Sequence, residues 1–171
     1  MNRHRRFAGG ALLAALCFAG LARAAGPVAA AAYRGASTAE LAPHPGVSDP
    51  RLAWQDWVLN CQGCHRPNGD GSAHTAPKLA GEVARYLRVP GGRAYLARIP
   101  GIASSPLDNR RLASVVNWML WRFDPADLPA DFRPFTAEEL GRMRSRPWRL
   151  GMYAVRRALQ ARIAAGAARG P

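Results

Sequence analysis

Near the middle of the chain, two cysteines and a histidine form a fixed pattern that constrains the fold more than any other feature. The pentapeptide reads Cys61-Gln62-Gly63-Cys64-His65, which is the signal for covalent haem attachment. Two thiols three positions apart can reach the two vinyl groups on one porphyrin edge, and the next residue then projects its imidazole towards iron. The motif predicts one haem c, attached through Cys61 and Cys64, with His65 as the proximal ligand.

Two other uses of a cysteine pair are weighed against haem. A redox-active dithiol is typical of a thioredoxin-like domain, but the βαβ pattern of such a domain is missing. A structural zinc site needs two further ligands, and the chain has no second pair of cysteines. Haem attachment is therefore the favoured interpretation, with dithiol chemistry and zinc as the alternatives.

The N-terminus predicts export. Three arginines within the first six residues precede the apolar run Phe7–Leu21, and Ala22-Arg23-Ala24 places small residues where a signal peptidase cleaves. The run is about 15 residues long, against the roughly 20 that a membrane-spanning helix needs. Residues 1–24 are therefore expected to be a signal peptide, and the mature protein to be periplasmic, soluble or peripherally bound to a membrane.

Loss of the signal peptide would remove Cys17 and leave Cys61 and Cys64 as the remaining cysteines. An oxidising compartment favours structural disulfides. However, a disulfide between two cysteines separated by only two residues cannot hold together a domain of this size. The pair is better explained by bonds to another group.

Positive charge is concentrated at the C-terminal end. Residues 140–171 contain eight arginines and no acidic residue, whereas residues 25–139 contain 12 basic and 11 acidic side chains. The basic segment has three interpretations: a docking surface for an acidic redox partner, an amphipathic helix on an anionic membrane, or a solvated extension. Nucleic-acid binding does not fit an exported protein.

Helical patterns follow one another along the chain, and no strand pattern is convincing. A flexible leader is expected over 25–47, a helical domain over 48–124 and a basic, partly helical extension over 125–171. Asp49-Pro50 begins the first helix, where order is expected to begin, and Asp108 caps the strongest helix, over 109–123. Further helices are expected over 81–88, over 92–99, after Thr136 with Glu139 in a capping box, and over 148–168. The predicted fold class is all-α.

Residues 49–123 resemble a class I (mitochondrial-type) cytochrome c domain. The order is similar: a helix into C-x-x-C-H, a glycine-rich loop, short helices and a C-terminal helix. The segments Pro67-Asn68-Gly69-Asp70-Gly71 and Pro77-Lys78-Leu79-Ala80-Gly81 resemble the family's loop after the haem histidine. The resemblance implies a cytochrome c-like helical domain wrapped around one covalent haem, and tryptophans of its first and last helices, Trp54 or Trp57 and Trp118 or Trp121, packed together.

The resemblance also implies a role for Pro77. In the family, a proline carbonyl in this loop accepts a hydrogen bond from the proximal histidine, and Pro77 stands at the matching place for His65. Such a bond fixes the tautomer of the imidazole and raises its basicity. The alternative is that Pro77 only forms a turn.

The second axial ligand is where the chain departs from the family. Class I cytochromes usually carry a methionine in the loop before the C-terminal helix, but the matching stretch here is Ile99-Pro100-Gly101-Ile102-Ala103. Met119, in the 109–123 helix, is the predicted metal ligand, with a core role as the alternative. The other options are His74, His44, Met143, Met152 or an open position.

The resemblance implies an electron-transfer protein without substrate chemistry of its own. The expected function is a one-electron carrier in an exported respiratory or dehydrogenase-linked chain. Its partners would be a dehydrogenase as donor and an oxidase or another cytochrome as acceptor, with peripheral membrane contact through the arginine-rich tail. The alternative is a haem sensor or a peroxidase-like protein with an open distal iron site.

Overall fold

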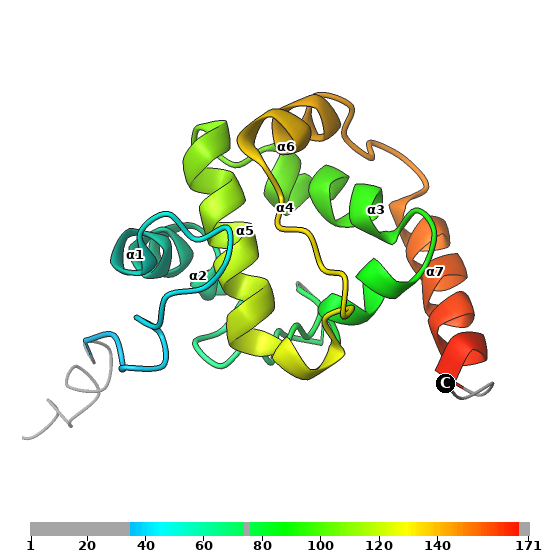
Figure 1. Cartoon of the computed structure of the whole chain (residues 1–171). Coiled ribbons are helices and arrows are strands. Elements are labelled where there is room, and N and C mark those ends of the chain that lie inside the picture. The colour runs from blue at the N-terminus through cyan, green and yellow to red at the C-terminus, as the bar shows by residue number, and fades with distance from the viewer. Residues whose placement is uncertain (1–34, 74–75, 168–171) are drawn as a thin grey trace, which may run out of the picture. The chain divides into compact units, whose positions relative to one another are not determined.

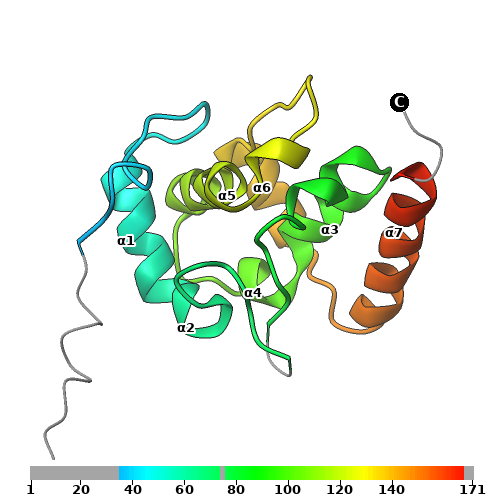
Figure 2. The same ribbon diagram turned by 90° about the horizontal axis from the view of Figure 1, so that it is seen from below.

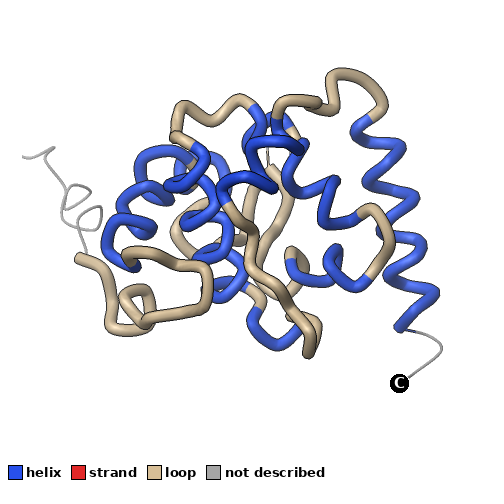
Figure 3. The backbone as a smooth tube through the Cα atoms, turned by 45° about the horizontal axis from the view of Figure 1, so that its top comes forward, coloured by secondary structure: helices blue, strands red, loops and turns tan. Residues whose placement is uncertain are grey.

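The structure is a computed structural model that describes residues 35–73 and 76–167. In these two ranges the chain forms helices joined by loops, with one isolated bridge between Ser72 and Ala76 (Figure 3). This confirms the all-α class. The helices are α1 (Pro50–Asn60), α2 (Gln62–His65), η1 (Ala84–Arg88), α3 (Gly92–Arg98), α4 (Pro100–Ala103), α5 (Asn109–Phe123), η2 (Pro125–Asp127), α6 (Ala137–Arg144) and α7 (Met152–Ala167).

Side-chain caps fix where the two main helices begin. The Asp49 carboxylate accepts hydrogen bonds from the amides of Arg51 and Leu52, and Pro50 occupies the first helical position, where its missing N–H costs nothing. Asp108 accepts from the amide of Arg111 in the same way. Both starts are those that the sequence predicts.

Helix α5 forms the centre of the fold and packs against α1 (Figure 1). Trp57 of α1 lies with its ring 5.9 Å from that of Trp118, both only 1% exposed. The guanidinium of Arg111 donates to the buried carboxylate of Asp56 over 3.1 Å. An aromatic contact and an ion pair therefore join α1 to α5. Trp121 instead stacks on His44.

The segment before α1 also lies on α5. The indole N–H of Trp118 donates to the carbonyl of Glu40 over 2.8 Å, and that of Trp121 to the carbonyl of Pro45 over 3.2 Å. Asn117 donates to the carbonyl of Gly46 over 2.9 Å. Contacts with α5 therefore begin upstream of Asp49, the residue at which the sequence predicts order to begin.

The chain after α5 packs back onto the same helix and onto α3. Phe135 and Leu140 are buried, and α6 contacts both α5 and α3. Helix α7 covers η1 and α3 at the end of the molecule away from α1, with Leu159 as its buried residue (Figures 1 and 2). Residues 36–167 belong to one compact unit.

Helix α4 is one element that the sequence pattern does not predict. The pattern predicts a helix over 92–99 and none directly after it, yet Pro100 begins a new turn that ends at Ala103. The physical reason is that proline cannot continue a helix but is well suited to the first position of the next one. Ile99 and Ile102 of this turn pack against the core.

Candidate haem-attachment site

Helix α1 ends directly before the first cysteine of the pair, and a short second helix follows. The backbone at Cys61 has φ −127° and ψ −41°, which ends α1, and its amide donates to the carbonyl of Trp57 over 2.9 Å. Helix α2 then makes a single turn, closed by the bond from the amide of His65 to the carbonyl of Cys61 over 3.0 Å. Residues four apart lie on the same side of a helix, so Cys61 and His65 share one face.

The backbone reverses direction immediately after His65. Arg66 has φ 62° and ψ 160°, a conformation that a residue with a side chain rarely adopts. Gly69 and Gly71 also have positive φ, which glycine tolerates without strain. The amide of Gly71 donates to the carbonyl of His65 over 3.0 Å, which closes the loop onto the histidine.

This loop brings Pro77 to the imidazole. Nδ1 of His65 lies 3.0 Å from the carbonyl oxygen of Pro77. A carbonyl oxygen can only accept a hydrogen bond, so Nδ1 must carry the proton and Nε2 keeps its lone pair. Burial lowers the pKa of His65 below its usual 6.5, and the bond to Pro77 partly opposes this shift. The neutral imidazole therefore has one nitrogen free to bind a metal.

The two thiols are available for bonding to a cofactor. Both cysteines are free, Cys61 half-buried and Cys64 exposed. Burial raises the pKa of Cys61 to about 11, with smaller contributions from Asp56 and Cys64. A redox-active dithiol needs a readily formed thiolate, so this pKa argues against dithiol chemistry. In the described residues, no group of three or more His, Cys, Asp or Glu side chains is placed to hold a metal ion.

A buried donor next to the histidine has no partner within the described part of the chain. The ring of Trp57 lies 6.0 Å from that of His65, and its Nε1 is buried without a hydrogen bond. Two free thiols, a free imidazole nitrogen and an unpaired N–H beside them fit a covalent haem with polar substituents.

The residues considered for the second axial position are scattered. Met119 is a core residue of α5, 9% exposed. His44 stacks on Trp121 with ring centres 5.1 Å apart, and Met152 packs against the core from α7. His74 lies outside the described residues. Burial suits a core residue and a ligand alike, so ligation by Met119 stays a prediction.

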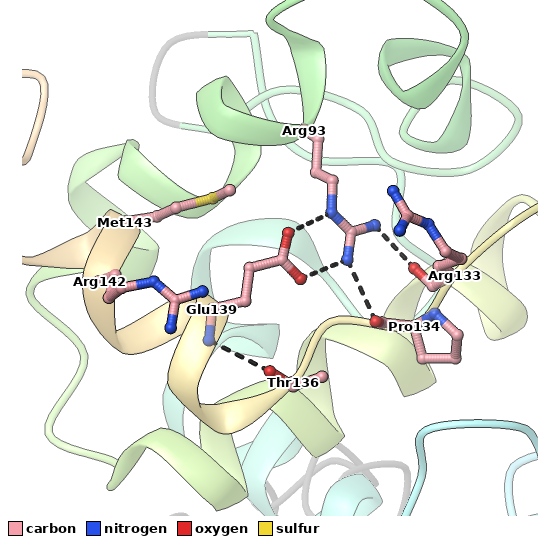
Figure 4. Close-up of a pocket in the computed structure, with 7 residues that line it drawn as sticks. All are labelled: Arg93, Arg133, Pro134, Thr136, Glu139, Arg142 and Met143. Carbon is pink, nitrogen blue, oxygen red and sulfur yellow. Dashed lines mark hydrogen bonds and ion pairs between the residues drawn. The ribbon is translucent and has the colours of Figure 1, made fainter.

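A hollow of about 410 Å³ lies between α3 and α6 (Figure 4). Its centre holds the ion pair between Arg93 and Glu139, and Met143, another of the axial candidates, lines its wall. None of its residues belongs to the haem motif. The lining residues are Arg93, Arg133, Pro134, Thr136, Glu139, Arg142 and Met143.

Comparison with known proteins agrees with this geometry. The family model for cytochrome c matches residues 53–130. Two proteins named cytochrome c-552, both from Thermus thermophilus, are 34% identical over 104 residues, an alignment that covers 50% of this chain and 79% and 70% of theirs. The chain belongs to the cytochrome c family. No solved structure matches it.

Membership in the family confirms the class I cytochrome c domain and its cofactor, one covalent haem c. The chain is thus a haem c electron carrier. When bound, the haem supplies a couple that takes up and releases one electron. Cys61 and Cys64 would hold it, and His65, oriented by Pro77, would bind its iron.

Several residues that support the site were not found from the sequence. Asp56 and Arg111 tie the helix before the motif to α5, and Arg144 holds the loop before α5. Asn117 joins that helix to the segments on both sides of the domain. All four side chains bond across elements to groups distant in the chain, so no local pattern marks their partners. Arg144 alone belongs to a feature that the sequence singles out, the arginine-rich tail.

Proposed function

We propose that this cytochrome is an exported one-electron carrier of a respiratory or dehydrogenase-linked chain, with haem attached to Cys61 and Cys64 and iron bound by Nε2 of His65. The observation that carries the assignment of the site is the hydrogen bond between His65 Nδ1 and the carbonyl of Pro77. It leaves Nε2 as the free nitrogen and fixes the ring, so that the ligand needs little rearrangement on reduction.

His65→Ala tests the proximal assignment. In protein expressed with a haem-attachment system, the variant should lose the low-spin ferric and ferrous spectra of the wild type, since the iron loses its nitrogen ligand. Leu59→Ala is the control, because Leu59 lies two residues before the motif, is 78% exposed and is not a candidate ligand. Normal spectra in His65→Ala would overturn the assignment.

Met119 is proposed as the second axial ligand. Met119→Leu keeps nearly the same volume, so a change of spectrum would report on ligation rather than on a cavity. We expect the far-red sulfur-to-iron band to disappear and carbon monoxide to bind the reduced protein. An unchanged spectrum would exclude Met119. If the wild type itself binds carbon monoxide rapidly, the distal position is open, which favours the sensor or peroxidase-like alternative.

The basic end of the chain is proposed to make contact with partners. Arg146, Arg149 and Arg157 are exposed, and Leu150 and Tyr153 beside them are 89% and 69% exposed. Positive charge with exposed apolar groups suits an acidic redox partner or an anionic membrane. Among the described residues, no helix has the length and apolar character to span a bilayer. Binding to anionic and to neutral vesicles is compared to distinguish the two partners. Binding to the anionic vesicles alone indicates a membrane, and binding to neither indicates an acidic redox partner.

Export is supported by residues 1–24, which lie outside the described residues. N-terminal sequencing of the mature protein from a periplasmic fraction tests it, and the first residue should follow Ala24 or Ala25. Full-length protein in the cytoplasm would contradict export.

A further inference from the structure

A buried carboxylate lies on the helix that leads into the haem motif. The side chain of Asp56, in α1, is 1% exposed, and both of its oxygens accept hydrogen bonds from the guanidinium of Arg111 in α5. Arg111 is far less enclosed, because 40% of its side chain is exposed. The pair therefore holds its negative charge inside the protein and its positive charge at the border with solvent.

This carboxylate is close to the groups that would hold the haem. Asp56 precedes Cys61 by five positions along the helix, a rise of about 7.5 Å. The next residue, Trp57, has its ring 6.0 Å from that of His65. Burial raises the pKa of Cys61 to about 11, and the negative charge of Asp56 adds to this shift. The field of the carboxylate therefore reaches the sulfur that would bond to the haem.

Stability alone does not account for a charged pair at this place. The rings of Trp57 and Trp118 already join α1 to α5. Taking two charges out of water often costs as much as their attraction returns, so two apolar side chains would join the same helices as well. Water screens the exposed guanidinium of Arg111 more strongly than the buried carboxylate. The pair therefore presents a net negative potential to the interior.

We propose that Asp56 and Arg111 tune the reduction potential of the haem: the carboxylate lowers the potential, and the guanidinium limits how far it falls. Reduction adds one electron, and so one negative charge, and no bond forms or breaks. A nearby anion opposes this change, and a nearby cation favours it. Both side chains act through their field and do not need to touch the iron. This inference rests on the proposed haem site at Cys61, Cys64 and His65.

Redox titration of the haem-loaded protein, followed by its absorption spectrum, tests the proposal. Asp56→Asn removes the anion at almost constant shape and should raise the potential. We expect the equilibrium constant for reduction to rise on the order of tenfold, which corresponds to about 59 mV for one electron. Arg111→Gln removes the cation and should lower the potential. A purely structural pair would give no shift, or shifts of the same sign in both variants.

Two exposed charges provide matched controls. Asp131→Asn and Arg51→Gln make the same chemical changes at exposed positions, where water screens the charge, and should leave the potential unchanged. The double variant Asp56→Asn/Arg111→Gln serves where a single variant does not fold, because it leaves no buried charge without a partner. Its potential should lie above that of the wild type, since the less screened of the two lost charges is the anion.

An unchanged or lowered potential in Asp56→Asn, or shifts of the same sign in Asp56→Asn and Arg111→Gln, would overturn the proposal. Shifts of equal size in the exposed controls would do the same. If a single variant does not fold, a double variant at or below the wild-type potential has this meaning too. Failure of the wild type to attach haem, or wild-type spectra in His65→Ala, would instead count against the proposed site.

Discussion

Single residues decide whether the carbonyl of Pro77 can reach His65. Gly71 has φ 67°, and a Cβ at this position would lie 2.6 Å from the Pro77 carbonyl oxygen. The absence of a side chain is therefore what allows the loop to close on the histidine. Arg66, the residue that follows His65, has a positive φ that costs on the order of 1–3 kcal/mol. The surrounding structure must therefore hold the turn beside the imidazole in place.

Gly71→Ala should destabilise the haem-loaded protein by about 2 kcal/mol or more, because both the positive φ and the contact with Pro77 become unfavourable. Denaturant unfolding measures this loss, and a changed ferric spectrum would show that the Pro77 carbonyl has moved from His65. Gly101→Ala is the control, since Gly101 lies outside the haem motif and an added Cβ there meets nothing within 4 Å. Equal effects of the two substitutions would contradict the role given to Gly71.

At the scale of elements, an ion pair couples α6 to α3. Arg93 binds the Glu139 carboxylate through two nitrogens and also donates to the carbonyls of Arg133 and Pro134 over 2.7 and 3.1 Å. The hydrogen bond from Arg93, opposed by burial, lowers the pKa of Glu139 below its usual 4.5. As the pH falls, Glu139 therefore binds a proton at a higher pH in the unfolded chain than in the folded protein.

The consequence is a defined dependence on pH. Glu139 contributes stability that is fully present above pH 4.5 and is lost as the pH falls through its folded pKa. Glu139→Gln should cost about 1–2 kcal/mol at neutral pH, and the difference from wild type should shrink below pH 4.5. Urea unfolding at several pH values measures it, with Asp131→Asn, an exposed acid of the preceding loop, as the control. A difference that stays constant with pH would refute the coupling.

For the molecule as a whole, Asn117 joins segments from both ends of the described chain. This fully buried side chain donates to the carbonyls of Gly46 and Phe135 over 2.9 and 3.0 Å and accepts from the Phe135 amide over 2.8 Å. The segment before α1 and the segment before α6 therefore meet on one amide of α5. The two backbone groups of Phe135 are buried, and the Gly46 carbonyl is part-buried.

Asn117→Ala should reduce the free energy of unfolding by about 2–4 kcal/mol, because it leaves buried backbone groups without hydrogen bonds. Asn60→Ala, which removes one bond to the Asp56 carbonyl at an exposed position, should cost less than about 1 kcal/mol. Chemical denaturation of both variants tests this, and a small effect of Asn117→Ala would mean that the two segments contribute little to stability.

The sequence by itself determined the parts of this protein that depend on short-range rules. The Asp49 and Asp108 caps act within three residues of themselves. The Cys61–His65 motif lies within one helical turn, and the resemblance to cytochrome c placed Pro77 twelve residues from the histidine it contacts. Turns of this length are fixed by the residues inside them, so a pattern can be recognised before the fold is known.

Only the tertiary structure decided which distant segments these helices hold. Asn117 and Gly46 are 71 positions apart, Trp118 and Glu40 are 78 apart, and Arg144 bonds across about 40 residues. In each case the acceptor is a backbone carbonyl, which every residue possesses and which therefore leaves no mark in the sequence. The composition revealed a tail rich in arginine, but not that Arg144 binds a loop of the haem domain while its neighbours face solvent.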